Sequence, residues 1–281
     1  MIEYLYLGRV AYDEALRLQD ELVELRRQGR IGNVLLLLEH PPVLTLGRNA
    51  QRANVLASDE LLARRGVTLH EINRGGDVTY HGPGQLIGYP IFDLRSLFNA
   101  SGSRLGPVDF VRLMEEALIR LCGVYGVRAG RICGLTGVWC GLADGNSLDG
   151  CGVKMAAPPP GATKIAAIGI HVSRGITSHG FAFNLTTDLR DFGLINPCGI
   201  TNCPVASLEL EMAASDAARP EPLPSLEAAA HRAARLFGQV FNQPVRAVES
   251  LAALRAQAKA PSAGAPEFSA PIFPAQDTPL Q

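Results

Sequence analysis

Strand-like segments outnumber helix-like segments in this sequence, and the two kinds do not alternate strictly along the chain. A doubly wound parallel sheet needs a helix after nearly every strand, so this order favours an α+β fold, in which helices pack on a mixed sheet. Short apolar runs predict strands at 33–38, 43–46, 67–72, 85–94, 135–140, 165–172 and 180–185. Apolar residues at helical spacing predict helices at 12–28, 107–125 and 225–240.

The chain of 281 residues is long enough for one large domain or two small ones. We expect a single domain over residues 1–252. Within it, residues 141–163 are rich in Gly and carry three consecutive prolines, which predicts a mobile loop inserted between two strands. Residues 253–281 are rich in Ala and Pro and hold few large apolar side chains, so we expect a disordered tail there.

Composition excludes several classes of function. Lys and Arg total 26 against 27 Asp and Glu, so the formal net charge of -1 argues against a nucleic-acid partner. The run of purely aliphatic residues at 34–38 is far shorter than the ~20 residues of a membrane helix, so we expect no membrane span. No signal or transit peptide is recognisable at the start, which favours a cytoplasmic protein. The six cysteines form no close CxxC pair and are expected to be reduced thiols rather than metal ligands.

The densest motif is a glycine-rich segment between predicted strands. It reads Arg74-Gly75-Gly76-Asp77-Val78-Thr79-Tyr80-His81-Gly82-Pro83-Gly84-Gln85. Glycines let a backbone approach a ligand closely, and the polar side chains among them could surround that ligand. The spacing is that of neither a dinucleotide loop nor a phosphate loop. A glycine-rich hairpin turn without a ligand remains the alternative.

A lysine opens an otherwise apolar strand, in the run Lys164-Ile165-Ala166-Ala167-Ile168-Gly169. At the edge of a buried sheet its ammonium would lose water and release a proton more readily, so Lys164 is a candidate acid/base. The alternative is a lysine at a strand end that extends into water. A second glycine-containing turn, 177–184, carries Gly180-Phe181-Ala182 and His179, and a structural histidine is the simpler interpretation of His179.

A cysteine between Pro197 and Gly199 is a candidate nucleophile. The proline fixes the backbone before Cys198, and the glycine leaves backbone N–H groups open to an oxyanion. Cys203 is the competing thiol, and either cysteine could instead be buried and inert. A cysteine paired with Lys164 would suit acyl transfer through a thioester, because a nearby ammonium favours the thiolate.

These motifs together resemble the octanoyltransferases of lipoate biosynthesis, the lipoyl(octanoyl) transferase family. The matching segments follow one another in the family's order: Pro41-Pro42 to Gly47-Arg48, Arg74 to Tyr89, Lys164 to Gly169, Thr177 to Asn184, and Asp188-Leu189 to Gly199. The resemblance covers about residues 1–245 and implies the fold of the biotin and lipoate protein ligases. The long 141–163 loop and the tail after about residue 252 depart from the family pattern.

The resemblance also implies a mechanism and its residues. Cys198 would take the octanoyl group from octanoyl-acyl carrier protein as a thioester and pass it to a lysine of a lipoyl domain, while Lys164 would favour the thiolate and move protons. The acceptors would be the lipoyl domains of 2-oxoacid dehydrogenase complexes and the glycine cleavage H protein, with no metal or nucleotide cofactor. The acyl pocket would be lined by Arg74, Gly75, Gly76, Asp77, Val78, Thr79, Tyr80, His81, Ala167, Ile168, Gly169, Gly180, Phe181 and Ala182.

Three other functions remain to be separated from this one. An ATP-dependent lipoate or biotin ligase of the same fold would need no nucleophilic thiol. An amidotransferase that moves octanoyl groups between lipoyl domains would use the thiol but start from an amide. A module that only binds acylated or lipoylated proteins would need neither Cys198 nor Lys164.

Overall fold

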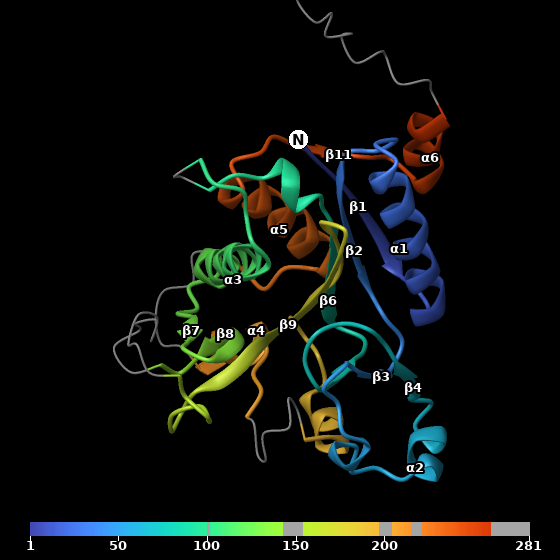
Figure 1. Cartoon of the computed structure of the whole chain (residues 1–281). Coiled ribbons are helices and arrows are strands. Elements are labelled where there is room, and N and C mark those ends of the chain that lie inside the picture. Colours follow the sequence, from blue (N-terminus) through green and yellow to red (C-terminus); the bar gives the residue numbers. More distant parts are fainter. Residues whose placement is uncertain (100–101, 143–153, 197–203, 215–220, 260–281) are drawn as a thin grey trace, which may run out of the picture.

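A computed structural model of the chain describes residues 1–99, 102–142, 154–196, 204–214 and 221–259 (Figure 1). Its centre is an eight-stranded sheet with the strand order β11-β1-β2-β6-β10-β9-β8-β7. In chain order these strands are β1 (Ile2–Arg9), β2 (Asn33–Glu39), β6 (Gln85–Ile91), β7 (Gly130–Ile132), β8 (Leu135–Cys140), β9 (Thr163–Ser173), β10 (Ile176–Asn184) and β11 (Val245–Ala247). β1 runs parallel to β2 and β11, whereas the other neighbouring pairs are antiparallel, so the sheet is mixed as predicted.

Helices cover both faces of this sheet (Figure 1). On one side lie α3 (Pro107–Val124) and α5 (Leu226–Val240), and on the other lie α1 (Tyr12–Arg27) and α6 (Leu251–Lys259). The central strand β2 explains why both faces must be covered: Leu35 and Leu37 belong to the α3–α5 core, while Leu36 and Leu38 belong to the α1–α6 core. Side chains alternate across a strand, so a continuous apolar run needs a helix on each side.

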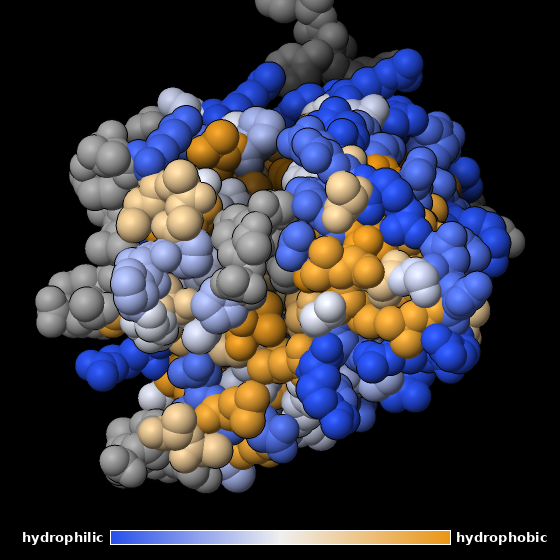
Figure 2. Space-filling model, turned by 90° about the horizontal axis from the view of Figure 1, so that it is seen from below, coloured by the Kyte–Doolittle hydropathy of each residue, from blue (hydrophilic) through white to orange (hydrophobic). Residues whose placement is uncertain are grey.

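A smaller sheet with the strand order β4-β3-β5 stands at one end of the larger one (Figure 1). It contains β3 (Val43–Leu46), β4 (Thr68–Glu71) and β5 (Val78–His81), and near it lie α2 (Asp59–Arg64) and the 3₁₀ turns η1 (Arg52–Asn54) and η4 (Leu189–Leu194). Its own core includes Leu44, Tyr80 and Phe192. Seen from this end, the molecule shows hydrophobic residues gathered in the middle of the face, with hydrophilic residues around them (Figure 2).

All ten predicted elements are confirmed, and β3 and β8 have the predicted bounds. In the described part of the chain, the remaining 3₁₀ turn and short helix are η2 (Leu94–Ser96) and α4 (Leu208–Ala214). Residues 253–259, which we expected in a disordered tail, instead lie within α6. There Leu254 and Ala258 are buried in the core beside α1, and Arg255 forms an ion pair with Glu21. Residues 260–281, the rest of that predicted tail, lie outside the described part of the chain.

Candidate active site

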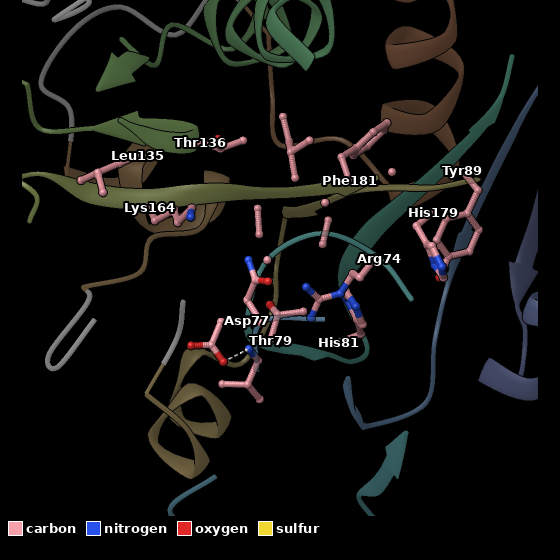
Figure 3. A pocket seen from close by; sticks show the side chains of 18 of the residues that line it. Arg74, Asp77, Thr79, His81, Tyr89, Leu135, Thr136, Lys164, His179 and Phe181 are labelled. Atoms are coloured by element: carbon pink, nitrogen blue, oxygen red, sulfur yellow. Dashed lines mark hydrogen bonds between the residues drawn. The ribbon is translucent and has the colours of Figure 1, made fainter. Parts of the chain in front are cut away.

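A cavity of about 570 Å³ lies between the smaller sheet and strands β8, β9 and β10 (Figure 3). Three sequence motifs that are far apart along the chain meet at its wall. The predicted residues that line it are Arg74, Gly76, Asp77, Val78, Thr79, His81, Lys164, Ala167, Ile168, Gly169, Gly180, Phe181 and Ala182. Pairing of β9 with β10 explains part of this meeting, because Gly169 stands opposite Gly180 and Ala167 opposite Ala182.

Two predicted residues, Gly75 and Tyr80, do not line the cavity. The N–H of Gly75 donates to the carbonyl of Ile170, so this residue ties the motif to β9. Tyr80 lies in β5, where alternate side chains point to opposite faces. Its ring packs on Phe192 in the core of the smaller sheet, and its hydroxyl donates to Asp191.

The buried Arg74 joins the cavity to the smaller sheet. Its guanidinium donates to the Thr45 carbonyl at 2.8 Å, to the Thr45 hydroxyl at 3.0 Å and to the Gly75 carbonyl at 3.0 Å. Three neutral acceptors therefore fix the direction of the side chain while its positive charge stays at the cavity wall (Figure 3).

A chain of buried side-chain amides fixes the tautomer of His81. The Gln85 amide nitrogen donates to the Tyr80 carbonyl at 3.2 Å and to Asn184 Oδ1 at 2.8 Å, so its oxygen faces His81 Nδ1 at 2.8 Å. The Asn184 amide in turn donates to the Ala206 carbonyl. His81 Nδ1 must then carry the proton, and Nε2 carries the lone pair. Since burial lowers the pKa of His81 to about 3, this imidazole is a neutral group at the cavity wall.

Two further buried histidines stand near His81 without charge. His40 Nδ1 donates to the Val10 carbonyl and its Nε2 accepts from the Tyr89 hydroxyl, both at 2.7 Å. His179 lines the cavity, and its Nε2 lies 2.8 Å from Asn73 Oδ1. Burial lowers the pKa of both histidines to about 4. His179 is therefore hydrogen-bonded, as its structural interpretation predicts, and lines the cavity as well.

These neutral histidines make the stability of the protein depend on pH. Their pKa values lie below the ~6.5 of an unfolded chain, so the stability they confer is complete above pH ~6.5 and is lost as the pH falls toward 4. We expect His179→Asn to reduce the loss of unfolding free energy between pH 6 and 5 by about 1.2 kcal/mol. Asn suits this position because His179 has a φ of 55°. Urea unfolding at the two pH values measures the difference, and an unchanged slope would contradict the prediction.

Lys164 is buried, and its side chain points into the cavity (Figure 3). Its Nζ lies 5.1 Å from the centre of the Trp139 ring. Its backbone N–H donates to the Pro204 carbonyl at 2.8 Å, and its carbonyl accepts from Ala206 N–H at 2.9 Å. The chain that follows residue 203 therefore runs directly beside Lys164.

Cys198 and the competing Cys203 lie outside the described residues, which stop at Asn196 and resume at Pro204. Both of these ends are attached to the wall of the cavity. Asn196 N–H donates to the Asn54 carbonyl at 2.7 Å, and the Asn54 amide donates to the cavity residue Asp77 at 2.7 Å. The Pro204 carbonyl accepts the hydrogen bond from the Lys164 N–H described above.

Nine further residues line the cavity without having been predicted from the sequence to do so, namely Tyr12, Asn49, Tyr89, Gly134, Leu135, Thr136, Met155, Ala156 and His179. Met155 and Ala156 belong to the inserted 141–163 loop, of which 143–153 lie outside the described residues. Met155 N–H donates to the Cys133 carbonyl at 2.8 Å, which attaches this end of the loop to the turn before β8. The insertion therefore contributes to the site rather than lying away from it.

Over the described ranges, no group of three or more His, Cys, Asp or Glu side chains is arranged as a metal site. Within the same ranges, none of the helices is long and apolar enough to cross a membrane.

Comparison with known proteins identifies the family. A family model described as the lipoyl protein ligase A/B catalytic domain matches residues 11–221. The chain is 58% identical to an octanoyltransferase of Acidobacterium capsulatum, over 89% of this chain and 94% of the relative. It is 48% identical to an octanoyltransferase of Koribacter versatilis, over 89% of this chain and 88% of the relative.

Solved structures with the same fold have little sequence in common with this chain. The crystal structure of lipoate-protein ligase A bound with ATP superimposes with a TM-score of 0.62 at 17% identity, covering 92% of this chain and 93% of that one. A bi-partite lipoate protein ligase from Thermoplasma acidophilum gives the same TM-score and identity, covering 92% and 91%. The predicted lipoate-ligase fold is confirmed. The chain belongs to the lipoyl protein ligase A/B catalytic-domain family and, within it, is an acyltransferase of the octanoyltransferase group.

Proposed function

We propose that this enzyme transfers the octanoyl group from octanoyl-acyl carrier protein to a lysine of a lipoyl domain through a thioester on Cys198. One observation carries the proposal: the chain on either side of residues 197–203 is hydrogen-bonded to the cavity wall. Asn196 is joined to Asp77 through Asn54, and Pro204 accepts a hydrogen bond from Lys164. A thiol borne by the intervening residues would lie near a cationic group and near a cavity that can receive an acyl chain. A cation beside the thiol favours the reactive thiolate, and the cavity can hold the acyl chain of the thioester.

The proposed reaction has two steps. The Cys198 thiolate attacks the carbonyl carbon of the donor thioester, the bond from that carbon to the carrier sulfur breaks, and the Lys164 ammonium protonates the departing carrier thiolate. The amine of the acceptor lysine then attacks the enzyme thioester. A C–N bond forms and the bond to Cys198 sulfur breaks. The amine's proton passes to the neutral Lys164, which restores the ammonium beside the thiolate.

The cavity suits an acyl group of this size. Its volume of about 570 Å³ falls in the range of ~300–1,000 Å³ that is usual for small-molecule sites. Ala167, Ile168, Phe181 and Ala182 offer apolar contact to the chain. The glycine and polar groups of the 74–81 segment that line the cavity offer backbone and side-chain contacts to the carbonyl end. The predicted substrate-binding residues other than Gly75 and Tyr80 therefore remain our assignment. The acceptor proteins, the 2-oxoacid dehydrogenase complexes and the glycine cleavage H protein, stay predictions, as does the cytoplasmic location.

Intact-protein mass spectrometry tests the proposal. We expect the enzyme mixed with octanoyl-acyl carrier protein, without ATP, to gain one octanoyl group that hydroxylamine removes, and a lipoyl domain added afterwards to take that group. If no adduct forms and the lipoyl domain is modified only when free octanoate and ATP are supplied, the protein is a ligase. If the adduct forms only from an octanoylated lipoyl domain, the protein is an amidotransferase.

A further inference from the structure

The ammonium of Lys164 rests over the ring of a fully buried tryptophan. Its Nζ is 5.1 Å from the centre of the Trp139 ring, within the ~6 Å at which a cation is attracted to an aromatic face. Trp139 has no solvent-exposed surface, and Lys164 is 6% exposed. A cation–π contact is strongest where water is excluded, and an indole is the best of the aromatic partners.

An irregularity in the sheet brings these two side chains together. In the β8–β9 ladder Val138 pairs with Ala166, but Trp139 pairs with Lys164, so Ile165 is an extra residue in β9. A regular ladder would place Ile165 opposite Trp139. Directly paired residues of antiparallel strands have side chains on the same face, and bulges of this kind redirect side chains near active sites. The bulge therefore places the lysine beside the indole.

The backbone at Gly137 lies close against one side of the lysine arm. Gly137 has a φ of 131°, and a Cβ atom there would stand 2.6 Å from Lys164 Cε and 2.5 Å from the Ala166 carbonyl oxygen. The Gly137 N–H donates to the buried carboxylate of Glu115 at 2.9 Å, which holds this stretch of β8 in place. Only a glycine lets the lysine arm pass so close to that backbone.

The indole itself is fixed in direction. Its Nε1–H donates to the Leu135 carbonyl at 3.1 Å, and the ring packs in a small core with Ile132 and Ala162. Leu135 also lines the cavity, so the ring and the cavity wall are held as one unit. A rigid aromatic face under a flexible four-carbon arm reduces the number of positions that the ammonium can take.

We propose that Trp139 is a positioning residue for Lys164: its indole face holds the ammonium at the cavity wall, where the acyl group is loaded and discharged. The inference rests on the proposed function, because Lys164 must take part in the reaction for its position to matter. Trp139 itself touches no substrate. It acts by keeping Lys164 in one arrangement through both steps.

Single-turnover loading of the octanoyl group tests this role in a double-mutant cycle. We expect Trp139→Leu to slow loading about ten-fold, and Trp139→Phe, which keeps an aromatic face, to recover most of that loss. In a Lys164→Met background, Trp139→Leu should have less than about a two-fold further effect, because the contact is already gone. The substrate concentration for half-maximal loading should stay the same in all variants, since the indole does not bind substrate.

Ile132→Ala is the matched control, because it opens the same small core without touching the ammonium. It should lower Tm as Trp139→Leu does and leave the loading rate within about two-fold. Equal slowing by Trp139→Leu with and without Lys164, or by Ile132→Ala, would overturn the inference and leave a purely structural tryptophan. If Lys164→Met alone loads normally, the role of Lys164 in the proposed function fails instead.

Discussion

Cys198→Ser is expected to abolish the octanoyl adduct and to slow transfer to a lipoyl domain by about 10³-fold or more, the scale of loss when a covalent nucleophile is removed. A serine hydroxyl is almost entirely protonated near neutral pH, and an ammonium beside it cannot ionise it as it does a thiol. Intact mass after mixing with octanoyl-acyl carrier protein measures the adduct, and Tm shows whether the variant is folded.

Cys203→Ser is the matched control, since it removes the other thiol of the same segment. It should load octanoyl normally. Two other cysteines are poor substitutes, because burial raises the pKa of both the Cys122 and the Cys140 thiols and keeps them protonated. An adduct that survives in Cys198→Ser and disappears in Cys203→Ser would transfer the nucleophilic role to Cys203.

The sheet could be predicted because its strands carry their own patterns. The continuous run of β2 and the short apolar run of β3 are visible in the sequence, and so is the helical spacing of α3. Strand β5 was not predicted, because one of its faces lines the cavity and the other packs in a core. Thr79 and His81 line the cavity while Tyr80 enters a core, so the polar residues hide the alternation and the segment looks like a loop.

Most of the motif residues that line the cavity could be predicted, but the residues that orient them could not. Gln85 and Asn184 are far apart in the sequence, and only the pairing of β6 with β10 makes them neighbours that orient His81. The contact between Trp139 and Lys164 depends on a bulge that shifts the ladder by one residue. Register and bulges arise from tertiary packing, so no local pattern reveals them.

Helix α6 also depends on tertiary packing and could not be predicted from the sequence. Its composition, rich in Ala with scattered polar residues, is equally typical of a helix and of an unstructured tail. Helical stability in proteins comes mainly from the packing of an apolar face. Leu254 and Ala258 supply that face only because α1 offers a surface to receive them.

Lys164→Met should slow octanoyl loading by about 10²- to 10⁴-fold, the usual contribution of a positioned acid/base, while the fold remains intact. Met keeps most of the length and apolar bulk of the arm beside Gly137 and Trp139, and loss of a buried charge need not destabilise the protein. Lys154→Met is the control, because Lys154 is exposed and does not line the cavity.

Lys164→Arg then separates the two roles that we assign to this lysine. A guanidinium keeps the positive charge that favours a thiolate, but it does not give up its proton in a protein. If charge alone matters, this variant should load octanoyl far faster than Lys164→Met. If proton transfer dominates, both variants should be similarly slow, and discharge to the lipoyl domain should fail in both, because the attacking amine has nowhere to leave its proton. Normal loading and discharge in Lys164→Met would contradict either role.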